Sequence, residues 1–300
     1  MGATRFHIPD LVGLCGPTFE LHVNKNCHKV AQTSQTWAAT AGFLTGDEIH
    51  TLDGLQLPLL ASLCFPSSDI NQLEMVTKIM ILFLHWSKAF DPASAGAFER
   101  LWGQLLRETP SKWQKRFSAH LQEFRQARTS TQSCTDCEHY KTFSRSHTGI
   151  MMTFDFVEYT AGLRIPMEVH ASLELRSIEQ CAHDIIASAK DIASYNREQS
   201  TSTPHNLVAV IMKEKACTLE CAIDTAEDML KKSIESYLVV EKKLPSWTPE
   251  IDEDLHRYLQ GLRDCIIGAI HWLYETDRYF GDKGEDVRKF GWVFLLAKRT

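Results

Sequence analysis

The chain has 300 residues, 44% of them hydrophobic, and a formal net charge of −6. This length and composition can bury a sizeable core, in one large helical domain or two small ones. No run of about 18 apolar residues occurs, which argues against a membrane-spanning helix. The basic residues are dispersed, which argues against a nucleic-acid partner.

The cysteine pattern indicates the redox compartment. Nine cysteines are scattered along the chain, and the odd count favours free thiols in a reducing compartment. The N-terminal stretch IPDLVGLCG has no basic leader and does not resemble a signal peptide. We therefore expect a cytoplasmic protein. Cys134, Cys137 and His139 come closest to a zinc spacing, but no second Cys/His pair follows at a suitable distance, which argues against zinc.

In chain order, residues 1–34 are expected to form an irregular arm, and residues 35–300 a single α-helical domain. A long apolar helix is predicted from about Ile70 to Asp91, where Pro92 stops it. Two amphipathic helices divided by Pro110 follow, then a polar link and a helical segment from Glu138.

Further helices are predicted in the C-terminal half. A short helix starts after Asn206, and a long amphipathic one, which Thr218 can cap, closes before Pro245. The last long helix begins near Glu250 with an acidic first turn that suits its dipole.

The stretch 177–206, with KDIASYNRE at its centre, is the most informative. Lys190, Ser194 and Glu198 are four residues apart and therefore lie in single file along one side of a helix. The apolar stripe borders this line at Ile186 and Ala193, so the polar line could face a cavity. The alternative is an ordinary solvated helix face.

This stretch resembles the metal-binding helix of class I terpene synthases, Asn/Asp-Asp-x-x-Ser/Thr-x-x-x-Glu. The resemblance implies the all-α isoprenoid synthase fold, with Asp191, Ser194 and Glu198 as ligands of a Mg²⁺ ion that holds a substrate diphosphate. The first position departs from the family, because Lys190 stands there and a protonated lysine cannot ligate Mg²⁺.

The family's aspartate-rich motif, Asp-Asp-x-x-Asp/Glu, resembles the end of the predicted helix at 70–91. Its five positions read Ser87, Lys88, Ala89, Phe90 and Asp91, so only the last acid remains. In the family these two helices face each other across the pocket mouth. Lys88 and Lys190 would then place ammonium groups where metal ions otherwise bind.

Two further stretches resemble the family. Arg145 matches the arginine that senses the diphosphate, although Ser144 fits another register, and Gly149 matches the helix break that presents a carbonyl to the nascent cation. Trp272, Arg278 and Tyr279 match the end of the last helix, where an Arg-Tyr pair binds the diphosphate. The alternative for Arg145 is an ordinary surface arginine.

Aromatic side chains are candidates to line the substrate pocket and stabilise a cation, although each is equally plausible as plain core. Those proposed are Phe83, Trp86, Phe90, Phe154, Phe156, Tyr159, Trp272 and Tyr279. In the tail, Phe290, Trp292, Phe294 and Leu295 either cover the pocket mouth or dock on the outer surface.

Three functions remain open from the sequence. The first is a terpene cyclase that ionises a prenyl diphosphate with a reduced Mg²⁺ set, the lysines and Arg145 and Arg278 neutralising the phosphates. The second is a repurposed, metal-independent enzyme in which Asp91, Asp191 or Glu198 acts as acid or base and a nucleophile such as an amine quenches the cation. The third is a non-catalytic binding relative. The sequence leaves the oligomeric state open, although proteins of the family it resembles often pair into homodimers.

Overall fold

The computed structural model describes residues 5–40, 44–86, 92–129, 134, 136–200 and 205–297. Helices make up nearly all of its regular structure. The elements are β1 (Arg5–His7), α1 (Leu11–Cys15), α2 (Cys27–Thr40), α3 (Gly46–Leu55), α4 (Leu57–Cys64), α5 (Ile70–Trp86), α6 (Pro92–Glu108), α7 (Ser111–Thr129), α8 (Cys137–His147), α9 (Ile150–Ala161), α10 (Met167–His170), α11 (Leu173–Gln199), α12 (Leu207–Lys215), α13 (Leu219–Glu241), α14 (Pro249–Glu275), α15 (Asp277–Phe280), the 3₁₀ turn η1 (Gly281–Lys283), α16 (Gly284–Phe290) and β2 (Trp292–Phe294). The predicted all-α fold is confirmed.

Helix boundaries follow the local sequence chemistry. The Thr218 side chain accepts a hydrogen bond from the Cys221 amide and starts α13, and Asn206 caps α12 in the same way at the Val208 amide. Helices α6 and α14 begin at a proline, which is tolerated in a first turn because the amide there is unpaired in any case.

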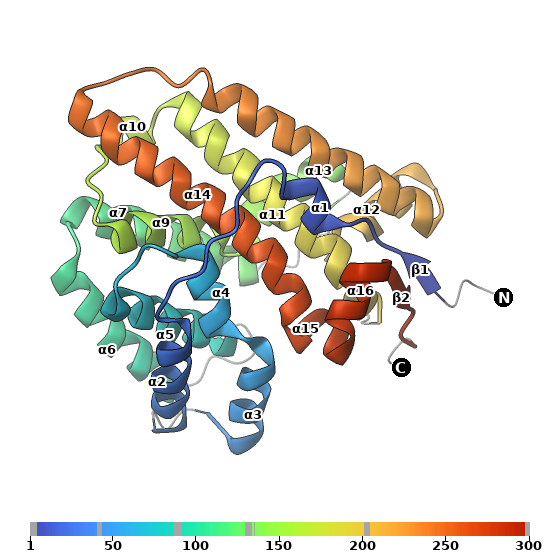
Figure 1. Ribbon diagram of the computed structural model, residues 1–300, viewed down its shortest axis with the longest axis horizontal. Helices are drawn as coiled ribbons and strands as arrows, with labels where there is room; N and C mark the ends of the chain where they lie inside the picture. Colours follow the sequence, from blue (N-terminus) through green and yellow to red (C-terminus); the bar gives the residue numbers. More distant parts are fainter. Residues whose placement is uncertain are drawn as a thin grey trace.

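Helix α11 is the central element. Ile178, Ile185 and Ile192 recur every seventh residue on one side of it and are fully buried. Figure 1 shows α11 (yellow) in the middle of the bundle, with α13 and α14 running beside it. Side chains of α11 therefore pack into the core of the bundle from its central helix.

A buried polar cluster fastens α7, α9, α10 and α11 together. The Arg116 guanidinium donates to Asp155, at 2.6 Å, and to Glu158. His170 Nε2 lies 3.3 Å from a Glu158 carboxylate oxygen, and His170 Nδ1 lies 3.7 Å from Glu179. Such charges are tolerated inside a protein only when they are paired, as they are here.

The two chain ends meet in a small antiparallel ribbon, in which Phe6 of β1 pairs with Val293 of β2 (Figure 1). The N-terminal arm expected over residues 1–34 thus contains a strand and a short helix, and from Cys27 onward it is already α2. The Asn196 side chain on α11 donates to the Phe294 carbonyl at 2.8 Å, which fixes the tail to the end of α11.

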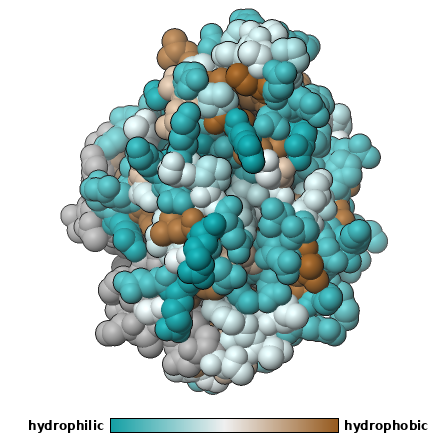
Figure 2. All heavy atoms as spheres, turned by 90° about the vertical axis from the view of Figure 1, so that its left-hand side faces the viewer, coloured by the Kyte–Doolittle hydropathy of each residue, from teal (hydrophilic) through white to brown (hydrophobic). Residues whose placement is uncertain are grey.

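The tail aromatics face outward. Phe290, Trp292 and Phe294 are exposed, and none of the four tail residues proposed as a lid lines the cavity described below. On the face at the left-hand side of Figure 1, hydrophilic side chains predominate and apolar ones are scattered (Figure 2). Among the residues that the structure describes, no helix has the length and apolar character needed to cross a membrane.

Candidate active site

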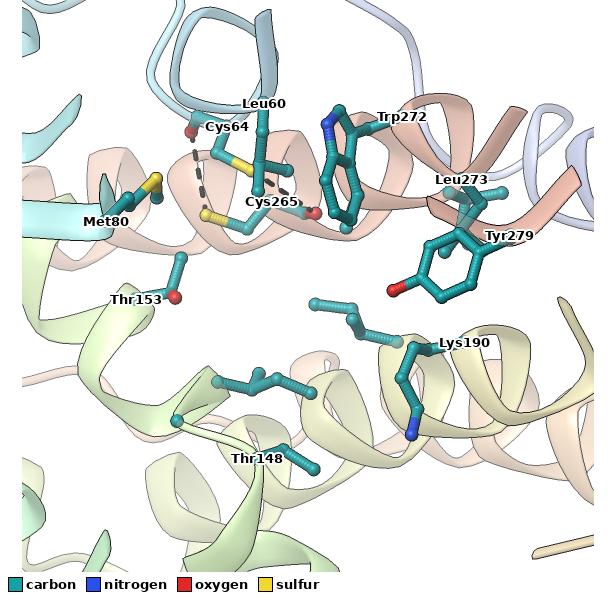
Figure 3. A pocket seen from close by; sticks show the side chains of 15 residues that line it. Leu60, Cys64, Met80, Thr148, Thr153, Lys190, Cys265, Trp272, Leu273 and Tyr279 are labelled. Carbon is teal, nitrogen blue, oxygen red and sulfur yellow. Dashed lines mark hydrogen bonds between the residues drawn. The ribbon is translucent and has the colours of Figure 1, made fainter. Parts of the chain in front are cut away.

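An apolar cavity of about 210 Å³ lies between α4, α5, α9, α11 and α14 (Figure 3). Its wall is made largely of aliphatic, thiol and aromatic groups, with few polar ones. The lining residues are Leu60, Cys64, Met80, Thr148, Gly149, Ile150, Thr153, Ile186, Lys190, Cys265, Ala269, Ile270, Trp272, Leu273 and Tyr279. Such a chamber can hold a hydrocarbon chain and exclude water from it.

The break between α8 and α9 forms one side of this cavity. Helix α8 ends at His147, and Gly149 takes φ +75°, a left-handed conformation that favours glycine. No side chain caps the start of α9. Gly149, Ile150 and Thr153 line the cavity, so the break brings main-chain groups to its wall.

Lys190 links the apolar cavity to the polar line on α11. It lines the cavity together with Ile186, one turn earlier on the helix. Its ammonium contacts the Asp191 carboxylate and lies 3.8 Å from Glu198, and Figure 3 shows it turned away from Tyr279. Burial opposes its charge, but Asp191 and Glu198 outweigh that effect and raise the pKa of Lys190, which stays protonated.

The Asp191 carboxylate is directed toward α8 and the start of α12. Its carboxylate accepts hydrogen bonds from the Tyr140 hydroxyl at 2.6 Å and from the Leu207 amide at 3.0 Å. Burial raises the pKa of Asp191, while Lys190 and Tyr140 act in the opposite direction. Asp191 therefore joins α11 to α8 and to the start of α12.

Ser194 and Glu198 are held by Asn206. The Asn206 amide donates to the Ser194 hydroxyl at 3.3 Å, to a Glu198 oxygen at 3.1 Å and to the Asp191 carbonyl at 2.8 Å. Arg197 lies 3.5 Å from the other Glu198 oxygen. The carboxylate of Glu198 is thus shared among one amide and two cations.

The end of α14 and α15 supplies aromatic and cationic groups. Trp272 and Tyr279 line the cavity and meet edge to face at 5.9 Å, and the Trp272 indole donates to the Leu55 carbonyl at 2.9 Å. The guanidinium carbons of Arg197 and Arg278 lie 5.9 and 6.0 Å from the centre of the Tyr279 ring. Two positive groups therefore stand near one cavity-lining phenol.

Residues 73–236, more than half of the chain, match the family model described as terpene synthase family 2, C-terminal metal binding. Sesquiterpene synthase Agr1 of Cyclocybe aegerita is 30% identical over 325 residues, covering 97% of this chain and 93% of Agr1. The chain belongs to the terpene synthase family.

Other terpene synthases give the same result. Sesquiterpene synthase 1 of Postia placenta is 27% identical over 329 residues, covering 99% of this chain and 97% of its own. The crystal structure of α-eudesmol synthase superposes with a TM-score of 0.76 at 19% identity, covering 85% of this chain and 97% of that one. Germacradien-4-ol synthase from Streptomyces citricolor gives a TM-score of 0.74 at 19% identity, covering 85% and 96%. These structures support the fold.

The terpene synthase residues on α11 do not fit a divalent metal as this chain presents them. Mg²⁺ prefers several oxygen ligands in octahedral geometry. Here Lys190 occupies the first ligand position, Asp191 is turned to Tyr140, and Glu198 faces two cations. Across the described part of the chain, no group of three His, Cys, Asp or Glu side chains is placed to hold a metal ion.

Not all the residues proposed from the terpene synthase resemblance reach the cavity. Lys190, Gly149, Trp272 and Tyr279 line it. Arg145 does not, because its guanidinium binds both carboxylate oxygens of Asp184, at 3.1 and 2.8 Å. Lys88, Phe90 and Asp91 lie outside the described residues, as does the side chain of Trp86.

The remaining aromatic candidates pack elsewhere. Phe83 lies against Phe124, with ring centres 6.2 Å apart. Phe154 and Phe156 are buried in the core, and the Tyr159 hydroxyl donates to Glu108 at 2.8 Å. Several lining residues were not proposed from the sequence, among them Thr148, Thr153, Cys64 and Cys265. Thr148 could have been found, because it directly precedes the predicted break.

Proposed function

We propose that this chain is a terpene cyclase that ionises a prenyl diphosphate and cyclises or quenches the resulting carbocation in the cavity. The observation that carries the proposal is the apolar chamber bordered by the α8–α9 break, Lys190 and Tyr279 in a chain of this family. Farnesyl diphosphate is the substrate we favour, since the curated relatives are named sesquiterpene synthases.

The charges at the cavity rim would stabilise the leaving diphosphate. A lysine ammonium has three N–H donors, so Lys190 can keep its Asp191 contact and still donate to a phosphate oxygen. Arg278 offers a planar guanidinium that suits a phosphate group. Arg145 can join them only by giving up part of its paired contact with Asp184.

The apolar wall would protect the cation. Carbon–oxygen bond cleavage leaves an allylic cation that water would capture, and an apolar wall limits the access of that water. The ring faces of Trp272 and Tyr279 can stabilise positive charge next to them. In this scheme, the aliphatic residues around these two rings determine the conformation that the prenyl chain of the substrate adopts before ring closure.

Metal dependence separates this proposal from the second candidate. The ion pairs of Glu198 with Lys190 and Arg197 favour metal independence. Metal independence is the feature of the second candidate, an enzyme that acts on another terpenoid and adds a nucleophile such as an amine. The other possibility is a reduced Mg²⁺ set in which Asp91 would join Ser194 and Glu198, while Lys88 would neutralise phosphate and not bind the metal.

Incubation with geranyl, farnesyl and geranylgeranyl diphosphates tests both, with Mg²⁺ or with EDTA, followed by assay of released diphosphate and of volatile products. A cyclase yields diphosphate and cyclic products from at least one substrate. If that turnover persists in EDTA, the ammonium groups replace the metal. Ligand binding without turnover of any substrate would favour a non-catalytic relative.

A further inference from the structure

A chain of hydrogen bonds runs from Arg145 to the cavity wall. Arg145 binds Asp184 through two N–H groups, and Asp184 Oδ1 lies 3.2 Å from Nδ1 of His183. The other ring nitrogen, Nε2, lies 3.0 Å from the hydroxyl of Thr148. Thr148 lines the cavity, and His183 is fully buried behind it.

The positions of the protons follow from the partners. Burial works against the charge of Asp184, but hydrogen bonds from His183 and Arg145 outweigh it and lower the pKa of this carboxyl group. An ionised carboxylate only accepts, so Nδ1 of His183 carries the hydrogen that faces it. In the neutral ring, Nε2 is then the acceptor, and the Thr148 hydroxyl donates to it.

This order of hydroxyl, imidazole and carboxylate is the arrangement that lets a hydroxyl transfer its proton to a base. A threonine near a helix end ordinarily bonds to a carbonyl of its own helix. Thr142 and Thr160 do so here, with Glu138 and Phe156. Thr148 is bonded instead to a side chain of α11, which gives its hydroxyl a base.

In a terpene cyclase, such a group can quench the final cation. The last cation must lose a proton, or be captured by water, before a neutral product can leave. Among the cavity-lining residues that the structure describes, Lys190 is held protonated by its carboxylate neighbours. Within the described part of the chain, the Thr153 hydroxyl has no imidazole or carboxylate partner, whereas Thr148 has His183.

We propose that Thr148, backed by His183 and Asp184, is the group that accepts the terminal proton of the cyclisation. The C–H bond next to the cationic carbon breaks, and its electron pair forms the carbon–carbon double bond. The proton goes to the Thr148 oxygen while the hydroxyl's own proton passes to Nε2. The resulting imidazolium is stabilised by the Asp184 carboxylate, and its proton returns to the released diphosphate. This inference rests on the proposed function.

The test separates ionisation from proton loss. For each variant, the quantity measured is the ratio of the main olefin formed to the diphosphate released. Thr148→Val removes the hydroxyl at nearly constant shape, and we expect that ratio to fall at least about tenfold, with other olefin isomers or alcohols making up the difference. Thr148→Ser keeps the hydroxyl and should restore it. The matched control is Thr142→Val, which changes an exposed threonine on α8, the helix that ends directly before Thr148.

His183→Phe provides a second variant, in which a phenyl ring without nitrogen atoms replaces the imidazole base. It should lower the same ratio even though Thr148 is intact, and circular dichroism verifies that each variant folds. A wild-type product ratio in Thr148→Val or His183→Phe overturns the proposal. So does an equal loss of olefin and diphosphate in both variants, since that outcome marks a role in binding or folding. If the wild-type enzyme releases no diphosphate at all, the proposed function itself is what fails.

Discussion

Replacing Lys190 by asparagine is the sharpest test of the idea that an ammonium has taken the place of a metal ion. The change restores an amide oxygen, which can ligate Mg²⁺, at the first position of the family pattern. Ser194 and Glu198 already occupy the other two positions, four and eight residues later. The change also removes the cation that contacts Asp191 and lies 3.8 Å from Glu198.

The expected cost follows from burial. Removing one partner of a fully buried ion pair costs about 3–5 kcal/mol, and an exposed pair is worth close to zero. The Lys190 side chain is 26% exposed and Asp191 is 1% exposed, and Asp191 keeps its bonds from Tyr140 and Leu207. We therefore expect a loss of about 2 kcal/mol, which corresponds to roughly 3 °C in melting temperature for a chain of this length.

Magnesium should reverse this loss in one variant and not in another. A ligand at a hundred times its dissociation constant stabilises the folded state by about 2.7 kcal/mol. Lys190→Asn should regain its melting temperature as Mg²⁺ is added, whereas Lys190→Met, which offers no ligand, should show only the Mg²⁺ response of the wild type. The assay is thermal unfolding with Mg²⁺ or EDTA and without substrate. Equal Mg²⁺ responses in the two variants would refute the reasoning.

Three further changes test other parts of the structure. Tyr140→Phe removes a buried hydroxyl bond to Asp191 and should lower the unfolding free energy by about 1.5–3 kcal/mol in urea; no change would mean that this bond is not formed. Burial lowers the pKa of His170, but Glu158 and Glu179 outweigh this effect and raise it. Protonated His170 therefore stabilises the fold below about pH 6.5, and this stabilisation is lost as the pH rises through the pKa of the folded state. The melting temperature should therefore fall on raising the pH, and His170→Gln should flatten the dependence; an unchanged slope would contradict this. Arg278→Gln should weaken binding of inorganic diphosphate roughly tenfold by calorimetry, and unaltered affinity would remove Arg278 from the phosphate site.

The helices could be predicted because their limits are local. Pro92 begins α6, Thr218 caps α13, and Gly149, with its positive φ, separates α8 from α9. Each of these effects depends on a few neighbouring residues, so a sequence is enough to see it. The strand in the N-terminal arm could not be predicted in this way, because β1 forms only by pairing with β2 at the other end of the chain.

The side-chain directions at the site could not be predicted in the same way. Successive residues on a helix diverge by about 100°, so Lys190 and Asp191 cannot both face one cavity. Which of them does so depends on Tyr140 and on the start of α12, which approach from other helices. Phe154 likewise follows Thr153, and the structure buries Phe154 in the core while Thr153 lines the cavity.

The charged side chains at the end of α11 balance one another. Lys190 and Arg197 contribute two positive charges, and Asp191 and Glu198 contribute two negative ones, so the group is neutral as it stands. A diphosphate entering there would add several negative charges. Because the lysine and Arg197 are already partly satisfied by carboxylates, the extra positive charge has to come from outside this group. Arg278, whose guanidinium carbon lies 6.0 Å from the centre of the Tyr279 ring, is in position to supply part of it.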